Sequence, residues 1–269
     1  MPKKRKKVGL ALGGGAVRGL IHVGVIKALM ENNIPIDYIA GCSIGAWVGA
    51  YFATYENIDI FEKEAARLKR ATLFSFLEPT FPSGLVRGDA LRKIVAKTVG
   101  HKKFSDLVIP LAIVATDINN GQEVDIHDGD LVSAIMGSMA VPIMYKPVRR
   151  NGKILVDGGL SNPVPDNIVK KMGADVVISV SLDNYDYAKI YKDTKMTLLN
   201  VASRSFSIIY RNLSFALMSD SDIVIKPKND LVGMTGWKRF FMDKIDQKFI
   251  NIGRKEAERA MPKIKELIS

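Results

Sequence analysis

The sequence has 269 residues, of which 47% are hydrophobic and 25% are charged. This length fits one large α/β domain or two small ones, and the composition argues against a largely disordered chain. No apolar run reaches the length of about 18 residues that a transmembrane helix requires, so none is predicted. The single cysteine, Cys42, excludes an internal disulfide and a metal site built from several cysteines.

The formal net charge is +11, and five of the positive charges lie in residues 3–7. This run resembles a nuclear-import or nucleic-acid arm, but it equally fits a solvated basic tail. No zinc finger or base-stacking motif accompanies it, which disfavours a nucleic-acid partner. The excess charge is compatible with peripheral contact with an anionic membrane surface. Three glycines and then Arg18 cut short the apolar residues 8–12, which is not the pattern of a signal peptide, so we expect a cytoplasmic protein that can lie at the membrane periphery. The sequence does not indicate an oligomeric state.

Residues 8–12 predict a short buried strand, which leads into Gly13-Gly14-Gly15-Ala16-Val17-Arg18-Gly19 and then a helix to Glu31. A glycine-rich turn between a strand and a helix presents backbone N–H groups that bind anions. Such a turn can bind the phosphates of a dinucleotide, or it can stabilise the oxyanion of an acyl-transfer reaction.

The spacing of the glycines favours the oxyanion interpretation. Gly13 and Gly15 fit the dinucleotide pattern, but Arg18 stands where its third glycine belongs. About 20 residues on, a dinucleotide site needs an acidic residue, whereas this chain has Gly41-Cys42-Ser43-Ile44-Gly45. An oxyanion loop explains both motifs, and a nucleotide site explains only the first.

The second motif, Gly-x-Ser-x-Gly, lies between a predicted strand that begins at Tyr38 and a small-residue helix that ends near Tyr55. This is the context of a nucleophile elbow, in which the serine occupies a strained turn with its hydroxyl accessible. Gly41 and Gly45 lack a Cβ and allow strand and helix to approach closely. Ser43 is therefore the predicted nucleophile. Cys42 is disfavoured as a nucleophile because Ser43 holds the central position, and we expect Cys42 to be packed inside.

The remaining chain alternates predicted helices and strands. Residues 74–85 are aromatic and broken by proline, and they fit either a mobile lid or a loop packed on the core. The other predicted elements are helices at 59–73, 89–99, 131–139, 165–172 and 197–218, strands at 108–116, 123–126, 145–148, 153–156, 176–180 and 223–225, a hairpin turn at 149–152, a linker at 183–193 and a helical tail from 237.

A serine nucleophile needs a base, and the chain has three histidines. His101 and His127 lie mid-chain without a strand-end setting, and His22 falls within a predicted helix, so a Ser-His triad is disfavoured. Asp157 is the better candidate because it ends a predicted strand and precedes Gly158-Gly159. A carboxylate there could accept the serine proton, although an Asp-Gly-Gly turn could also bond only its own backbone.

The three motifs, in this order, resemble the patatin-like phospholipase family in its shorter bacterial form, and residues 138–142 resemble a further block of that family. The resemblance implies a three-layer α/β/α sandwich with a mixed, mostly parallel sheet. It further implies a Ser43–Asp157 dyad that needs neither metal nor cofactor. The loop Gly14-Gly15-Ala16 would donate to the oxyanion, with Arg18 bracing it. Gly13 and Ala16 depart from the plant pattern, which leaves open which amides act.

The sequence thus predicts a basic tail (1–7) followed by a single patatin-like domain (8–269), with the motifs in 8–185 and a helical C-terminal part in 186–269. Its expected activity is hydrolysis of fatty-acyl esters of phospholipids or related lipids. Two alternatives remain at this point. The first is a nucleotide-binding protein that uses the glycine-rich loop, and the second is a non-catalytic adaptor on a membrane surface.

Overall fold

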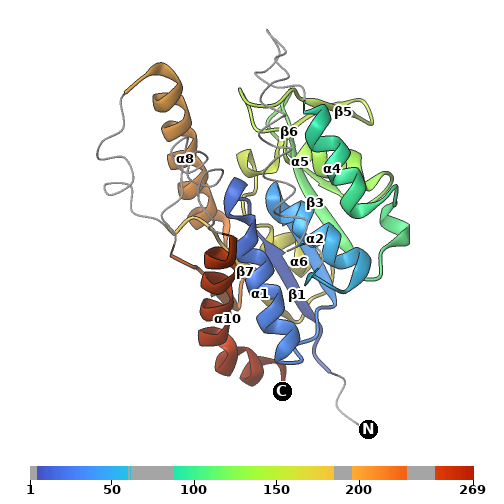
Figure 1. Ribbon diagram of the computed structural model, residues 1–269, viewed down its shortest axis with the longest axis vertical. Helices are drawn as coiled ribbons and strands as arrows, with labels where there is room; N and C mark the ends of the chain where they lie inside the picture. Colours follow the sequence, from blue (N-terminus) through green and yellow to red (C-terminus); the bar gives the residue numbers. More distant parts are fainter. Residues whose placement is uncertain (1–4, 60, 62–87, 185–195, 229–245) are drawn as a thin grey trace.

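The computed structural model describes residues 5–59, 61, 88–184, 196–228 and 246–269 (Figure 1). The helix predicted at 59–73, the aromatic segment 74–85 and most of the predicted linker 183–193 lie outside these residues.

Within the described residues, eight strands form one mixed sheet. Five of them run parallel to their neighbours, in the order β3-β2-β1-β7-β8, while β4, β5 and β6 pair antiparallel. The predicted parallel β-α-β unit is confirmed by the pairing of β1 with β2. The strand bounds are β1 Val8–Leu12, β2 Tyr38–Cys42, β3 Leu111–Asp117, β4 Glu123–Ile126, β5 Val148–Arg150, β6 Lys153–Asp157, β7 Val176–Val180 and β8 Ile223–Ile225.

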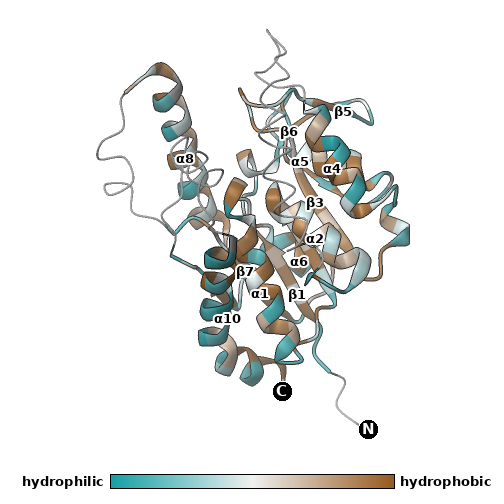
Figure 2. Cartoon of the chain, in the orientation of Figure 1, coloured by the Kyte–Doolittle hydropathy of each residue, from teal (hydrophilic) through white to brown (hydrophobic). Residues whose placement is uncertain are grey.

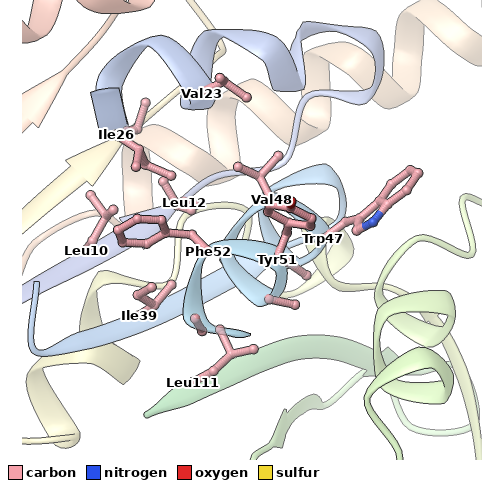
Figure 3. Close-up of a cluster of buried hydrophobic side chains, with 14 of the residues drawn as sticks. Leu10, Leu12, Val23, Ile26, Ile39, Trp47, Val48, Tyr51, Phe52 and Leu111 are labelled. Carbon is pink, nitrogen blue, oxygen red and sulfur yellow. The ribbon is translucent and has the colours of Figure 1, made fainter. Parts of the chain in front are cut away.

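Helices cover both faces of this sheet, as the sequence predicts for a three-layer α/β/α fold. Leu10 and Leu12 of β1 pack with α1, α2, α5 and α10, and part of this cluster is drawn in Figure 3. Ala11, between them, faces the other way and packs with Ile168 and Val169 of α6. This alternation follows from the two-residue period of a strand. The α-helices are α1 Leu20–Glu31, α2 Ile44–Tyr55, α4 Asp89–Val99, α5 Leu131–Ser138, α6 Asp166–Lys171, α8 Leu198–Leu217 and α10 Asp246–Ile268.

The C-terminal helix α10 is part of the core. A Cβ on Gly24 of α1 would lie 1.9 Å from the carbonyl oxygen of Ile250, and a Cβ on Gly253 would lie 2.0 Å from that of Ile21. The two helices therefore touch backbone to backbone, an approach that only glycine permits. Figure 2 shows that the outer face of α10 is largely hydrophilic.

The strands β2 and β6 lie end to end along one edge of β3. Cys42, the last residue of β2, pairs with Val114, and Asp157, the last residue of β6, pairs with Ala115. Because β4 occupies the opposite edge of both β3 positions, β2 and β6 share the remaining edge. β2 runs parallel to β3 and β6 runs antiparallel, so their C-terminal ends point at each other.

Three predicted boundaries need correction. The strand predicted at 145–148 is β5, which begins only at Val148 and includes Arg149 and Arg150, so the hairpin loop consists of Asn151 and Gly152 alone. Both loop residues have positive φ, 46° and 76°, as a two-residue type I′ turn requires. The third predicted strand begins at Leu111 rather than at residue 108, because Pro110 cannot donate to the ladder.

Residues 5–7, assigned by sequence to the basic tail, contact the body of the molecule. Arg5 forms a salt bridge of 2.6 Å with Asp37, and Lys7 donates from Nζ to the Tyr38 hydroxyl at 2.7 Å. None of the described helices combines the length and the apolar character that crossing a bilayer would take.

Candidate active site

Ser43 occupies the turn between β2 and α2 in a strained backbone conformation. Its φ is 52° and its ψ is −121°, a combination that suits glycine rather than a residue with a Cβ. The flanking glycines make this turn possible. A Cβ on Gly45 would lie 2.1 Å from the Leu12 carbonyl oxygen, and one on Gly41 would lie 2.6 Å from the Cα of Ala46. The geometry is that of the strand–turn–helix elbow predicted from the sequence.

The side chains of Ser43 and Asp157 meet directly. The Ser43 hydroxyl donates to Oδ2 of Asp157 at 2.6 Å, and the other carboxylate oxygen accepts from the Gly159 N–H at 2.8 Å. The carboxylate thus closes its own Asp-Gly-Gly turn and also accepts a hydrogen bond from the serine hydroxyl. A Cβ on Gly158 would lie 2.2 Å from the Val114 carbonyl oxygen, which explains the glycine there.

The surroundings of Asp157 alter its acidity. Burial raises the pKa of this carboxyl to about 6, while the hydrogen bonds from Ser43 and Gly159 act in the opposite direction. Asp157 is 1% exposed and Ser43 is 6% exposed. Near neutral pH Asp157 is therefore an ionised acceptor whose basicity is well above that of an ordinary aspartate.

The end of α5 and the residues that follow it hold the backbone of both Ser43 and Asp157 in place. Oγ of Ser138 accepts from the Ser43 N–H at 2.8 Å and donates to the Val114 carbonyl at 2.6 Å. Two residues on, the carbonyl oxygen of Ala140 accepts from the Asp157 N–H at 3.0 Å. The sequence marked residues 138–142 as a family block without giving it a role. Its role in the structure is to position the two strand ends that carry Ser43 and Asp157.

The glycine-rich loop has fewer free amides than the sequence suggested. The Gly13 N–H donates to the Val180 carbonyl and the Gly14 N–H to the Pro163 carbonyl, each at 3.0 Å. The Gly15 and Ala16 N–H groups donate to no residue within the described parts of the chain. Of the loop amides expected to donate to an oxyanion, those of Gly15 and Ala16 therefore remain as candidates, while those of Gly13 and Gly14 are engaged.

Two buried side chains support this loop from below. Nε of Arg18 donates to the Gly15 carbonyl at 3.0 Å, and Nη1 donates to the Leu182 carbonyl. Nε2 of His22, in α1, lies 2.7 Å from the Gly13 carbonyl oxygen. Burial lowers the pKa of His22 to about 4, so the ring is neutral at pH 7 and donates from Nε2. Sequence analysis missed this role of His22, because nothing in a helical histidine signals a loop carbonyl beneath it.

The other two histidines do not join the site. His101 and His127 are exposed, and His127 lies 3.9 Å from Asp125. Across the described part of the chain, neither forms a hydrogen bond with Ser43 or Asp157. Cys42 is fully buried, and burial raises the pKa of its thiol well above the usual value. A neutral, enclosed thiol is a packing residue.

Tyr210 of α8 reaches the site, although no sequence motif predicted it. A Cβ on Gly14 would lie 1.7 Å from Oη of Tyr210, and a Cβ on Gly159 would lie 1.7 Å from its ring carbon Cε2. The same hydroxyl lies 3.7 Å from Sγ of Cys42. The glycines of two motifs therefore leave room for the Tyr210 ring as well as for their own turns.

A serine at a strained strand-to-helix turn, at the end of the parallel strand β2, is the arrangement of the nucleophile in α/β serine hydrolases, and here that serine faces a buried carboxylate. The patatin-like phospholipase family model matches residues 10–168, which is more than half of the chain. The chain therefore belongs to the patatin-like phospholipase family, a family of lipid acyl hydrolases.

Individual relatives agree with this assignment. An uncharacterized NTE family protein of Mycobacterium tuberculosis is 38% identical over 178 residues, covering 66% of this chain and 49% of that protein. Lysophospholipase NTE1 of Pyricularia oryzae is 33% identical over 198 residues, covering 70% of this chain and 13% of that protein. The chain thus spans about half of the mycobacterial relative and a small part of the fungal one.

A solved structure supports the fold. The crystal structure of VipD from Legionella pneumophila superimposes with a TM-score of 0.55 at 12% sequence identity, covering 97% of this chain and 67% of that one. At this identity the similarity establishes the fold alone.

Proposed function

We propose that this chain hydrolyses fatty-acyl esters of phospholipids or related lipids, with Ser43 as nucleophile and Asp157 as its base. One observation carries the proposal. In a member of the patatin-like phospholipase family, the hydroxyl of a serine at a strained turn donates to a buried carboxylate at 2.6 Å. That pairing of nucleophile and base is the requirement for covalent acyl transfer.

The reaction proceeds in two halves. Oγ of Ser43 attacks the ester carbonyl while its proton passes to Oδ2 of Asp157, and a tetrahedral oxyanion forms. Asp157 then gives the proton to the leaving alcohol, the C–O bond breaks, and an acyl-serine remains. Water attacks the acyl-serine, its proton passes to Asp157, and return of that proton to Oγ releases the fatty acid.

The developing negative charge needs donors in place before the reaction begins. We assign the free amides of Gly15 and Ala16 to this task, with Arg18 and His22 holding the loop through carbonyl groups. Loss of one oxyanion donor costs on the order of 100–1000-fold in rate in serine hydrolases. The amides of Gly13 and Gly14 are engaged by Val180 and Pro163, which argues against use of the same loop to bind the phosphates of a nucleotide.

The comparisons supply a first set of substrates. One relative carries the name lysophospholipase, so lysophospholipids belong in the test beside diacyl phospholipids. A lipid substrate also fits a basic chain that contacts an anionic surface, with a net charge of +11.

The test is covalent labelling combined with product analysis. A fluorophosphonate probe should label wild type but not Ser43→Ala, whereas Ser105→Ala, which changes an exposed serine, should label fully. Wild type incubated with a lipid extract should release fatty acids that mass spectrometry identifies, and Ser43→Ala should not. Nucleotide binding without any ester hydrolysis would favour the nucleotide alternative. A cellular function that survives Ser43→Ala unaltered would favour the adaptor.

A further inference from the structure

Helix α8 exposes several large apolar residues to solvent, while a polar residue on its other side is buried. Leu198 is 88% exposed and Ile209 is 62% exposed, whereas Ser214 is buried. A surface helix ordinarily shows the reverse arrangement. Figure 2 shows hydrophobic residues along this helix, and Figure 1 shows its N-terminal half extending away from the sheet. The exposed apolar face of α8 consists of Leu198, Val201, Ile208, Ile209 and Phe215.

Packing does not account for how α8 is held. Within the described parts of the chain, α8 has no extensive contact with another helix or strand. Tyr210 is its buried anchor, but this side chain belongs to neither hydrophobic cluster. It lies instead against the backbone at Gly14 and Gly159, on the oxyanion loop and beside Asp157.

A buried carboxylate forms the second attachment. Asp183 is 1% exposed, and its Oδ1 lies 3.8 Å from Nη2 of Arg18. Burial raises the pKa of Asp183, while Arg18 and then Ser214 and Arg211 of α8 lower it. The same Asp183 therefore faces the brace of the oxyanion loop and the inner side of α8. A polar attachment of this kind can exchange with water more readily than an apolar one.

The Tyr210 ring fills the space beside the nucleophile. A Cβ built on Gly14 would lie 1.7 Å from Oη of Tyr210 and 3.3 Å from Cβ of Ser43, so the phenol and the serine lie on the same side of Gly14. With the phenol there, Ser43 is 6% exposed. An ester carbonyl must come within about 3–3.5 Å of Oγ to react. The phenol lies beside a serine that is almost fully enclosed, so we take widening of the site for a lipid to require movement of Tyr210.

We propose that the exposed apolar face of α8 docks on the surface of an anionic lipid aggregate, and that docking draws Tyr210 away from Ser43 and opens the site. This inference rests on the proposed function, because it assumes that the substrate is presented by such a surface. Charge complementarity selects lipid as the occupant. Cζ of Arg211 and Nζ of Lys226 each lie 5.1 Å from the centroid of the Phe215 ring, so two cations border the apolar face at its C-terminal end. Apolar side chains bordered by cations are the usual means of binding an anionic bilayer surface.

The docking half is tested by flotation with vesicles of phosphatidylcholine, with and without phosphatidylglycerol. Ile209→Ser and Leu198→Ser should each lower binding to the anionic vesicles by about tenfold, the contribution of one buried aliphatic side chain. The matched control is Val108→Ser. Val108 is 59% exposed but precedes β3, at the end of the sheet opposite Ser43, so its variant should bind like wild type.

The opening half is tested with a short, monomeric ester in the absence of vesicles. Tyr210→Ala should raise kcat/KM on this ester several-fold, because the cover is gone, while Tyr210→Phe should match wild type. On vesicles, Ile209→Ser should lose activity in proportion to its binding and keep wild-type activity on the monomeric ester. A decrease in monomer hydrolysis in Tyr210→Ala, with an unchanged melting temperature, would show that Tyr210 serves the chemistry and would overturn the opening step.

The binding experiment stands apart from catalysis. If wild type hydrolyses neither ester, the proposed function fails, yet vesicle binding of Ile209→Ser against Val108→Ser still decides the docking surface. If the α8 variants bind vesicles like wild type, the docking proposal fails even where hydrolysis is normal. Conversion of a wild-type dimer to a monomer by Ile209→Ser, measured by sedimentation with vesicle binding unchanged, would assign the face to a second copy of the chain and overturn lipid docking.

Discussion

Ser43 follows β2 and Asp157 ends β6, and the two strands meet on β3. The free-energy cost of holding each residue nevertheless takes a different form. Ser43 has an unusual backbone, with φ 52° and ψ −121°, and a hydroxyl of ordinary chemistry. Asp157 has an ordinary backbone, with φ −48° and ψ 132°, and a carboxyl whose pKa burial raises to about 6. The cost is backbone strain at the first strand end and desolvation of a charge at the second.

Because the cost is strain at Ser43 and desolvation at Asp157, substitutions at these two residues should affect stability differently. Removing the Ser43 side-chain oxygen leaves the strained φ in place, so the strain persists in an inactive protein. Removing the Asp157 charge also removes the reason for its desolvation cost, so that cost disappears together with activity. Rate and stability measured together on variants of each residue therefore test the comparison, provided the two quantities are recorded on the same samples.

The largest effect is expected for Asp157→Asn. The amide cannot accept the Ser43 proton, so kcat should fall by about 100–10,000-fold. Above about pH 6 the melting temperature should hold or rise, since the charge penalised by a pKa shift of about two units, or about 3 kcal/mol, is gone. Enzyme assays and thermal unfolding on one preparation check both. A lower melting temperature with most of the activity retained would reduce Asp157 to a residue that closes a turn.

Two controls belong with this variant. Asp166→Asn alters another buried carboxylate, which accepts from the Ser221 hydroxyl at 2.8 Å, and it should lower the melting temperature without removing activity. The double variant of Ser43→Ala and Asp157→Asn should be little slower than either single variant, because the two residues act as a unit. A large additive loss would contradict the dyad.

Ser138→Ala should come next in magnitude, because this hydroxyl accepts from the Ser43 N–H and ties it to the Val114 carbonyl of β3. We expect a loss of about 100-fold in kcat from a displaced nucleophile, with KM little changed. Stability should fall by about 1–3 kcal/mol, because a buried N–H and a buried carbonyl lose their partner. Steady-state kinetics and chemical denaturation measure the two effects. Normal kcat would show that the strained turn keeps its geometry without Ser138.

The pH profile sharpens the comparison from the Asp157 side. Asp157 must be ionised to accept the proton, so kcat/KM should fall as pH drops through about 6, tenfold for each further pH unit. Fluorophosphonate labelling of Ser43 should follow the same curve, whereas circular dichroism should stay constant across it. An inflection near the ordinary aspartate pKa of about 4 would mean that burial does not perturb this carboxyl in solution.

The smallest expected effect is a difference in stability between two variants of Ser43, and it tests the backbone strain there. Ser43→Gly and Ser43→Ala are both expected to be inactive, but glycine relieves about 1–3 kcal/mol of backbone strain and gives back about 0.5–1 kcal/mol in unfolded-state entropy. Ser43→Gly should therefore be more stable than Ser43→Ala by about 1 kcal/mol in urea denaturation. Equal stabilities would show that the turn holds no strain at residue 43.

Local patterns were enough to predict the elements around the site. The elbow at Ser43, the β1–β2 parallel pair and the Asn151-Gly152 hairpin each depend on a few adjacent residues, and the structure has all three elements. The strand limits were less accurate where a single residue decides them, as at Pro110.

What the sequence could not indicate depends on distant pairing. The meeting of β2 and β6 on one edge of β3 brings together residues 43 and 157, and no local pattern encodes that register. Local patterns also could not indicate that Ser138 accepts from the Ser43 N–H, or that Tyr210 lies beside Gly14. Tyr210 follows the last sequence motif. Which loop amides are free likewise depends on partners such as Pro163, far along the chain.

Because β2 and β6 meet end to end on β3, their pairing with β3 sets the distance between Ser43 and Asp157. Neighbouring positions on a strand are about 3.3 Å apart, so the Val114–Ala115 step sets how far the ends of β2 and β6 stand from each other. A slip of either strand by one residue would add or remove a whole step and break the 2.6 Å contact between the two side chains. Insertions or deletions in the loops between these strands do not change how β2 and β6 pair with β3. The loops between residues 43 and 157 that touch neither β3 nor the site can therefore change in length, while the registers of β2 and β6 cannot.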